Sequence, residues 1–241
     1  MRNILIIQAR MGSERLPGKV LLPLGDAHVL DYVVARARAV RGVTEVVVAT
    51  STLAGDDPIV GFCAERDVPC FRGPERDVLS RFYHCAVAHR ADRVIRVTAD
   101  CPFVDHEQAS EIVLAMDRAP VDIVKLRGEQ PRGLWSEMLS FEALVRIHAA
   151  AKEPRHREHV TLLAYELGDQ FSAAWIDVLS EMAHPELRIT IDTPEDYALL
   201  QAVAAAFPSD RLVSSAAVVR FILDHPEVGA LNAMIRQKPV V

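Results

Sequence analysis

A short apolar strand followed by a basic, glycine-containing loop opens the chain. The run Leu5–Ile7 is continuously apolar, which is typical of a strand buried on both faces of a parallel sheet. Glycines let main-chain N–H groups approach a ligand closely, and arginine and lysine side chains suit phosphate oxygens. Residues 8–19 carry two glycines and three cations: Gly12, Gly18, Arg10, Arg15 and Lys19. The segment therefore predicts a phosphate-binding loop.

Two common nucleotide-binding motifs do not fit this loop. A P-loop has four residues between its first glycine and the Gly-Lys pair, and Ser or Thr follows the lysine. Here five residues separate Gly12 from Gly18, and Val20 follows Lys19. The dinucleotide-binding fingerprint G-x-G-x-x-G is also absent. A solvated basic turn after a core strand is the alternative for this segment taken alone.

Composition and charge limit the class of protein. The chain has 241 residues, of which 50% are hydrophobic and 25% charged, as in ordinary globular proteins. A net charge of −6 makes the molecule as a whole a poor partner for nucleic acid. No stretch could span a bilayer and the first apolar run is too short for a signal peptide, so we expect a cytoplasmic protein without a membrane partner. The cysteines are too widely spaced for a C-x-x-C motif and predict small buried side chains.

Strand-like and helix-like segments alternate along the first half of the chain. Strands are predicted at 4–7, 43–50, 68–72, 93–98 and 121–125, and helices at 26–40, 57–64, 78–87 and 105–116. The pattern is less regular afterwards, with helices predicted at 141–151, 157–167, 193–206 and 216–223 and strands at 171–178 and 187–191. This order predicts one α/β domain over 1–241, with three layers and a mainly parallel central sheet.

Two aspartates follow predicted strands. Asp100 comes after the strand at 93–98, and Asp192 after the strand at 187–191. Parallel α/β sheets bind ligands beyond the carboxyl ends of their strands, and Mg²⁺ takes one or two carboxylates together with phosphate oxygens and water. The pair therefore indicates a magnesium site facing a triphosphate. The alternative is that each aspartate caps a turn or helix, as Asp192 could before Thr193-Pro194.

Three motifs in the same order resemble a known family. They are Gln8–Lys19, Arg96–Pro102 and Asp192–Asp196. The chain resembles the spore coat polysaccharide type cytidylyltransferases, which are related to the enzymes that activate 3-deoxy-manno-octulosonate and acylneuraminate as CMP-sugars. The resemblance implies the nucleotide-diphospho-sugar transferase fold, in which a mixed, mainly parallel sheet carries a smaller β-rich extension. Here that extension, expected at 128–186, would bind the acceptor and form a homodimer interface.

The resemblance also implies a reaction. It would transfer CMP from CTP to a sugar or sugar acid, with Mg²⁺ as cofactor and release of pyrophosphate, for a surface polysaccharide. A sugar hydroxyl would attack the α-phosphorus while the protein positions the reactants and stabilises charge on oxygens. A second ion or Asp192 would help to deprotonate that hydroxyl.

Site residues are implied by the same resemblance. Ala9 and Arg10 would meet the cytosine, and Asp100 and Asp192 would hold the metal. The catalytic residues would be Arg15, Lys19 and Asp100. The nucleotide would be bound by Ala9, Arg10, Met11, Gly12, Ser13, Arg15, Lys19, Arg72, Thr98 and Ala99. The acceptor would be bound by Arg132, Glu137, Arg157 and His159, although solvated charges or surface ion pairs are the alternative for these four and for Arg72.

Three positions depart from the pattern of relatives. Ala99 stands where relatives commonly have Gly, Trp135 where they have Asp, and Thr98 where the octulosonate enzymes have Gln. Two other functions stay open: a glycosyltransferase that consumes a nucleotide-sugar, and a catalytically weakened nucleotide-binding protein. The first would favour an Asp-x-Asp motif, but Pro102 stands two residues after Asp100. The second is disfavoured because Arg15, Lys19, Asp100 and Asp192 are all present.

Overall fold

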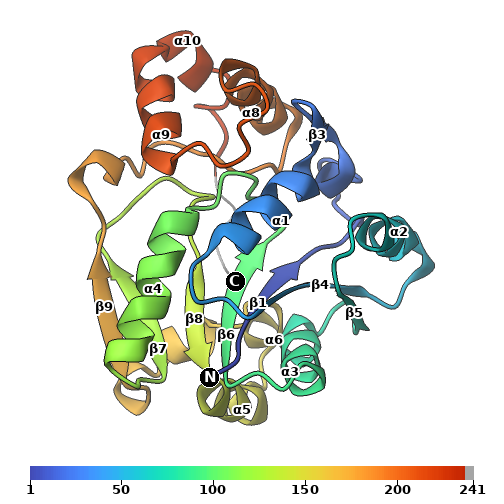
Figure 1. The fold of residues 1–241 in the computed structure, drawn as a ribbon, viewed down its shortest axis with the longest axis vertical. Helices are drawn as coiled ribbons and strands as arrows, with labels where there is room; N and C mark the ends of the chain where they lie inside the picture. Colours follow the sequence, from blue (N-terminus) through green and yellow to red (C-terminus); the bar gives the residue numbers. More distant parts are fainter. Residues whose placement is uncertain (237–241) are drawn as a thin grey trace.

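A seven-stranded sheet forms the centre of the structure, a computed structural model that describes residues 1–236 (Figure 1). The strands lie in the order β5-β4-β1-β6-β8-β7-β9, and only β8 runs antiparallel to its neighbours. Their bounds are β1 (Asn3–Gln8), β4 (Glu45–Ser51), β5 (Cys70–Gly73), β6 (Arg93–Thr98), β7 (Ile123–Arg127), β8 (Glu137–Ser140) and β9 (Ala173–Asp177). The predicted mainly parallel sheet is confirmed. A separate two-stranded ribbon joins β2 (Pro23–Leu24) and β3 (Ala27–His28).

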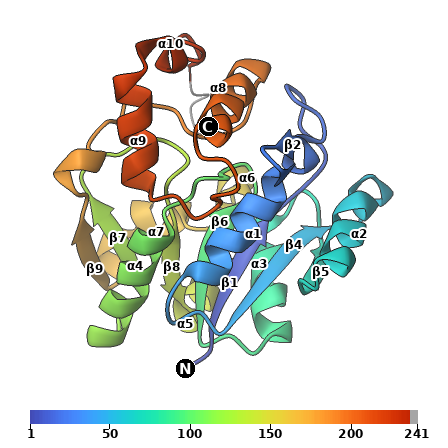
Figure 2. The ribbon, with the colours of Figure 1, turned by 45° about the horizontal axis from the view of Figure 1, so that its top comes forward.

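Helices cover both faces of the sheet, which gives the predicted three layers. One face packs against α1 (Val29–Ala39), α2 (Asp57–Glu65) and α4 (His106–Arg118). The other packs against α3 (Val78–Ala88), α5 (Phe141–Ala150) and α7 (Leu162–Glu166). Figure 2 shows α1 and α4 together in front of the sheet. Within residues 1–236, no helix is long and apolar enough to cross a membrane.

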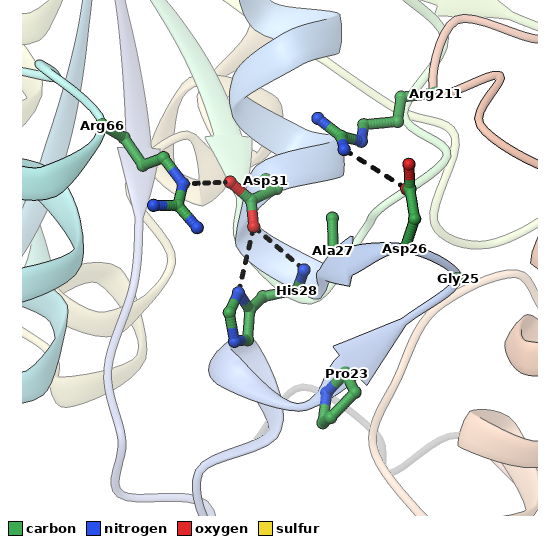
Figure 3. A pocket seen from close by; sticks show the side chains of 8 residues that line it. All are labelled: Pro23, Gly25, Asp26, Ala27, His28, Asp31, Arg66 and Arg211. Atoms are coloured by element: carbon green, nitrogen blue, oxygen red, sulfur yellow. Dashed lines mark hydrogen bonds and ion pairs between the residues drawn. The ribbon is translucent and has the colours of Figure 1, made fainter.

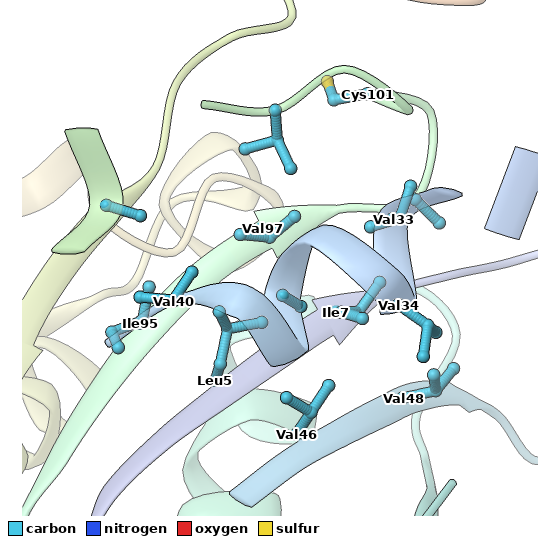
Figure 4. Close-up of a cluster of buried hydrophobic side chains, with 14 of the residues drawn as sticks. Leu5, Ile7, Val33, Val34, Val40, Val46, Val48, Ile95, Val97 and Cys101 are labelled. Atoms are coloured by element: carbon cyan, nitrogen blue, oxygen red, sulfur yellow. The ribbon is translucent and has the colours of Figure 1, made fainter. Parts of the chain in front are cut away.

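The alternation of side chains along β1 explains why its apolar run is continuous. Leu5 and Ile7 point into the core beneath α1, where they meet Val33 and Val34 (Figure 4). Ile4 and Ile6 point to the opposite face and join the second core cluster. Successive residues of a strand face opposite sides of the sheet, so a strand buried on both sides must be apolar at every position.

A third core cluster lies beyond the carboxyl ends of the strands. It is built by α8 (Pro194–Ala206), α9 (Ser215–Asp224) and α10 (Pro226–Gly229), which gather at one end of the molecule (Figure 1). The fully buried Arg36 of α1 joins this layer to the rest, because its guanidinium donates to the carbonyl oxygens of Val104 at 2.7 Å and Val213 at 2.8 Å. The last part of the chain therefore covers the sheet edge where ligands bind in α/β folds.

The predicted strand at 187–191 is wrong. The segment makes one parallel bridge, between Arg132 and Arg188, and then leaves to donate the Ile191 N–H to the Asp100 carbonyl oxygen at 2.9 Å. Gly133 allows this close crossing. Its φ is +102°, and a Cβ there would lie 2.1 Å from the Ile189 carbonyl oxygen.

Residues 128–186 contribute two strands, β8 and β9, to the central sheet, with β8 inserted between β6 and β7. The predicted helix at 157–167 is two short helices, α6 (Pro154–Glu158) and α7, because the chain turns at Thr161, whose hydroxyl donates to Glu137 at 2.9 Å. The roles of this region in acceptor binding and dimerisation stay predictions.

We expect Gly133→Ala to destabilise the fold by more than about 2 kcal/mol, because a left-handed backbone and a backbone clash act together. Thermal unfolding compared with Gly168→Ala would measure the effect, since nothing lies within 4 Å of a Cβ at Gly168. Equal melting temperatures for the two variants would contradict the close approach of Gly133 to Ile189.

Candidate active site

The ammonium of Lys19 joins two carboxylates from distant parts of the chain. Its Nζ lies 2.9 Å from Asp100 Oδ2 and 2.8 Å from Asp192 Oδ1, and it also donates to the Ile191 carbonyl oxygen at 2.7 Å. The structure therefore brings together three residues that the sequence singled out separately. The Asp100 side chain remains 28% exposed, so the cluster is open to solvent on the Asp100 side.

Backbone contacts explain this convergence. The Asp100 carbonyl oxygen accepts the Ile191 N–H at 2.9 Å and the Thr190 hydroxyl at 3.0 Å, which places Asp192 beside Asp100 without a strand. On the other side, Gly18 adopts φ +70°, a left-handed conformation that glycine favours, and a short 3₁₀ turn from Lys19 to Leu21 follows. The loop thus ends with Lys19 directed at both carboxylates.

The cluster is electrostatically coupled. Burial opposes the charge on Lys19, but Asp100 and Asp192 outweigh it and raise the pKa of the ammonium above its ordinary value. Burial likewise opposes ionisation of Asp100, but Lys19 outweighs it and holds the pKa of the carboxyl well below its usual range. The pKa of Asp192 is lowered against its burial in the same way, first by Lys19. All three groups are charged at neutral pH.

Asp192 is not the cap of the helix that follows it. The N-cap of α8 is Thr193, which forms a capping box with Asp196. The Asp192 carboxylate instead contacts cations, with Oδ2 accepting from Arg188 Nη2 at 2.5 Å and lying 3.2 Å from Arg15 Nη2. Lys19, Arg15 and Arg188 thus surround this carboxylate.

The first part of the loop is anchored by Asp56, which the sequence reasoning missed. Asp56 is buried, and its carboxylate accepts the Met11 N–H at 2.7 Å and the Ser51 N–H at 3.1 Å. The sequence signal for this role is the pair of aspartates in Asp56-Asp57-Pro58, because only one of them can begin the helix and the other is free for another contact. Asp56 therefore fixes the loop against the end of β4.

We expect Asp56→Ala to lower the free energy of unfolding by about 2–3 kcal/mol at neutral pH, because two backbone N–H groups lose a charged acceptor. Burial raises the pKa of Asp56, but hydrogen bonds from Ser51 and Met11 outweigh it and lower the pKa overall. A depressed carboxyl pKa stabilises the fold above the unfolded-state pKa, so the difference between wild type and variant should shrink as pH falls below about 4.

Denaturant unfolding at several pH values would measure this effect. The matched control is Asp57→Ala, which removes the neighbouring exposed carboxylate paired with Arg72 and should cost no more than about 1 kcal/mol. A stability difference that stays constant between pH 7 and pH 3 would contradict the assigned contacts.

The other residues expected to bind the nucleotide lie around this loop or at the end of β6. Ala9 is buried and its N–H bonds to Ala49, whereas the Arg10 side chain is exposed and has no hydrogen-bond partner among the described residues. The Met11 carbonyl oxygen accepts from Ser13 at 2.9 Å and from Gly18 at 3.0 Å, which closes the loop on itself. Gly12 is exposed, Ala99 is buried, and the Thr98 hydroxyl lies 3.2 Å from Cys101 Sγ.

Two predicted ligand-binding arginines have other partners. Arg72 donates to the carbonyl oxygens of Ser51 and Leu53, both at 2.8 Å, and pairs with Asp57. Arg157 contacts Asp77 and Ser80 of the α3 N-terminus, at 2.5 and 2.7 Å. Both side chains hold elements together in this structure, and their predicted contacts with a ligand would require these bonds to be exchanged.

The remaining predicted acceptor residues form a second, mainly cationic cluster. Glu137 of β8 lies opposite Arg96 of β6, with 3.0 Å between the Arg96 Nη1 and the carboxylate. Burial lowers the pKa of the His159 imidazole, and the charges of Arg96 and Arg132 lower it further. Arg132 is exposed, and its side chain has no hydrogen-bond partner within residues 1–236.

Arg96 and Lys125 were not assigned by the sequence reasoning. Lys125 lies on β7, with its Nζ 4.5 Å from the centre of the Tyr165 ring. Burial lowers the pKa of its ammonium more than the charge of Glu137 raises it, so the pKa lies below its ordinary value. Arg96 stands between Ile95 and Val97, and Lys125 between Val124 and Leu126, and a cation flanked by apolar strand residues was the available signal. Trp135, which stands where relatives have Asp, is exposed in the loop before β8.

A pocket of about 590 Å³ lies elsewhere, beside the β2–β3 ribbon (Figure 3). Its charged side chains are paired with one another, since Arg66 bonds to Asp31 at 2.8 Å and Arg211 to Asp26 at 3.2 Å. None of the predicted site residues lines it. We therefore place the candidate site at Lys19, Asp100 and Asp192.

Comparisons with known proteins identify the family of the chain. The profile of the family described as Cytidylyltransferase matches residues 4–227. The chain is 34% identical to the uncharacterized protein MJ1063 of Methanocaldococcus jannaschii, with 99% of this chain and 97% of that protein covered. It is also 34% identical to the spore coat polysaccharide biosynthesis protein SpsF of Bacillus subtilis, with 94% and 97% covered.

Solved structures give the same result. A cytidylyltransferase from Leptospira borgpetersenii is similar with a TM-score of 0.89 at 28% identity, over 98% of this chain and 100% of that one. A CMP:2-keto-3-deoxy-manno-octonic acid synthetase complexed with CTP shares the fold, with a TM-score of 0.66 at 17% identity over 86% of this chain and 100% of that one. Fold and profile together define a nucleotidyltransferase. The chain belongs to the cytidylyltransferase family.

Proposed function

We propose that this chain transfers the cytidylyl group of CTP to a hydroxyl of an acidic sugar, with Mg²⁺ as cofactor and release of pyrophosphate, for synthesis of a surface polysaccharide. The family supports the cytidylyl transfer, and the similarity to a spore coat polysaccharide protein supports the pathway. The observation that carries the proposal is the ammonium of Lys19 held between Asp100 and Asp192 at the end of the basic loop.

The donor set fits magnesium bound together with a triphosphate. Among the described residues, no three His, Cys, Asp or Glu side chains gather into a metal site. Asp100 and Asp192 supply two carboxylates, and Mg²⁺ characteristically completes its shell with phosphate oxygens and water. When bound there, Mg²⁺ would supply a Lewis acid for the α-phosphate oxygens.

The residues of the chain would then orient the reactants and stabilise charge. The acceptor hydroxyl oxygen attacks the α-phosphorus and its proton passes to water, the bond from that phosphorus to the bridging oxygen breaks, and pyrophosphate leaves with the electron pair. The exposed Arg15 is placed to bind the phosphate oxygens that gain charge. Lys19 donates to Asp100, Asp192 and the Ile191 carbonyl oxygen, so it would bind those oxygens by exchanging one of these contacts. Asp192 is a weak base because its pKa is lowered, so we assign it to the metal rather than to the proton of the hydroxyl.

The second cluster would receive the acidic group of the acceptor. Arg96 pairs with Glu137, Lys125 interacts electrostatically with the same carboxylate, and His159 interacts with Arg96, Arg132, Glu137 and Glu158. The cluster thus holds three cations and two carboxylates, which leaves excess positive charge. Arginine pairs with carboxylates in a bidentate geometry, and Arg132 has an unbound guanidinium within residues 1–236. A sugar acid is therefore the acceptor class that we favour over a neutral sugar.

We expect Arg132→Gln to raise the KM for the acceptor at least about tenfold, because a charge-assisted pair contributes roughly 1.5–3 kcal/mol, and to leave CTP affinity unchanged. Steady-state kinetics with each substrate varied in turn would measure this. Arg118→Gln, which changes an exposed arginine in the last turn of α4, is the control. An unchanged acceptor KM would remove Arg132 from the acceptor site.

The function itself is tested by measuring pyrophosphate release. Purified protein is incubated with Mg²⁺, one of the four nucleoside triphosphates and a panel of neutral and acidic sugars. We expect release with CTP and an acidic sugar only. Binding of CTP without release from any pair would favour the nucleotide-binding protein, and consumption of a CMP-sugar would favour the glycosyltransferase.

A further inference from the structure

We propose that Arg188, Asp196 and Asn232 form a positioning chain that fixes the orientation of Asp192, so that the segment after α10 helps to build the metal-binding edge of the site. The inference rests on the proposed function, because it concerns how the second carboxylate is presented to a metal–nucleotide complex. All three residues lie outside the loop and outside the carboxylate pair.

The first link is the guanidinium of Arg188, which bridges two carboxylates. Its Nη2 donates to Asp192 Oδ2 at 2.5 Å and its Nε to Asp196 Oδ1 at 2.8 Å. Asp196 is completely buried and the Arg188 side chain is 8% exposed, whereas the Asp192 side chain is 15% exposed. The bridge therefore runs from the interior to the edge of the site.

The second link joins the Asp196 carboxylate to the backbone at Asp192. Asp196 Oδ2 accepts the N–H of Asp192 at 3.0 Å and the N–H of Thr193 at 3.2 Å. Asp196 thus holds the main chain at Asp192 with one oxygen and, through Arg188, the side chain with the other. Both the position and the rotation of the Asp192 carboxylate depend on it.

The third link comes from the C-terminal part of the described chain. The side-chain amide of Asn232 donates to Asp196 Oδ1 and to the Arg188 carbonyl oxygen, both at 2.9 Å. Asn232 is 4% exposed although its neighbours Leu231 and Ala233 are exposed. One inward-facing amide between exposed residues indicates a specific contact rather than general packing.

Asp192 needs partners that fix its orientation because several cations lie around it. Lys19 binds Oδ1, while Arg188 and Arg15 approach Oδ2, so an unrestrained carboxylate could rotate toward any of them. Partners that hold a metal-ligating carboxylate tune metal affinity, and their loss typically costs about 10- to 100-fold. Buried ion pairs contribute little net stability on average, so orientation is the better explanation for this bridge.

The experiment measures CTP binding by calorimetry with and without Mn²⁺, since the ratio of the two dissociation constants isolates the contribution of the metal. For Asn232→Ala we expect this ratio to fall about tenfold, with metal-free CTP affinity unchanged. Turnover of the variant should return to the wild-type value at saturating Mn²⁺. Gln170→Ala, an exposed amide, is the control.

Arg188→Lys is the second variant, because lysine keeps the charge but lacks the planar fork with which Arg188 reaches Asp192 through Nη2 and Asp196 through Nε. If Arg188 positions Asp192, this variant also loses the Mn²⁺ enhancement of CTP binding. Full retention of that enhancement in either variant would overturn the inference. Equal weakening of CTP binding with and without Mn²⁺ would also overturn it, because that result indicates a purely structural role. Absence of Mn²⁺ enhancement in the wild-type protein would instead refute the proposed function.

Discussion

Lys19→Met should lower turnover by about 10²- to 10³-fold, the typical cost of removing one preorganised group that stabilises developing charge. The same variant should bind Mn²⁺ more tightly than wild type when CTP is absent. The ammonium of Lys19 lies within 2.9 Å of both carboxylates that would hold the metal. Without it, Asp100 and Asp192 lose the cation that does most to lower the pKa of each carboxyl.

Single-turnover kinetics and calorimetry with Mn²⁺ alone would test both effects in one variant. Lys152→Met is the matched control, because Lys152 is exposed and lies in the linker before α6. Reduced turnover with unchanged Mn²⁺ affinity would leave Lys19 as a phosphate ligand but would remove its competition with the metal. Wild-type turnover in a folded Lys19→Met protein would refute the site.

Asp100→Asn should reduce turnover at least about 100-fold and weaken the Mn²⁺ enhancement of CTP binding, because an amide carries no charge for the metal. The shape of the side chain is kept, and the backbone contacts of Asp100 with Thr190 and Ile191 involve its carbonyl oxygen. Loss of the charge also removes the ion pair with Lys19, so we expect a lower melting temperature but a folded protein. Turnover measured where the variant is folded separates loss of function from loss of fold.

Asp169→Asn provides the control, since Asp169 is exposed in the short turn before β9. Activity of both variants would be followed as pyrophosphate release over a range of Mg²⁺ concentrations. If excess Mg²⁺ restored full turnover to Asp100→Asn, Asp100 would be a minor ligand and the metal would depend mainly on Asp192.

The central sheet and its first loop were predictable because their signals are local. The four central residues of β1 are apolar and fully buried, since the strand lies between two parallel neighbours and is covered on both faces. The resemblance to cytidylyltransferases rested on short continuous motifs, and the family match confirmed it. The residue roles that the resemblance implies stay predictions.

The sequence predictions failed where residues pair with others that are distant in the chain. β8 has only four residues and is placed by antiparallel neighbours on both sides, so its own composition carries little information. The segment 187–191 is as apolar as a strand, yet it crosses Gly133 and turns to Asp100. Asp56 stands at the N-cap position of α2, but its carboxylate accepts the N–H groups of Met11 and Ser51 rather than an N–H group of that helix.

The sequence by itself determined that a basic loop follows a buried strand and that two aspartates follow later apolar segments, because periodicity and glycine placement are local properties. Only the tertiary structure decided that Lys19 lies between Asp100 and Asp192, that Arg72 and Arg157 have partners elsewhere, and that Asn232 reaches the Asp192 region. Such contacts join residues up to 173 positions apart. They depend on the packing of the C-terminal helices over the sheet edge, which no local pattern encodes.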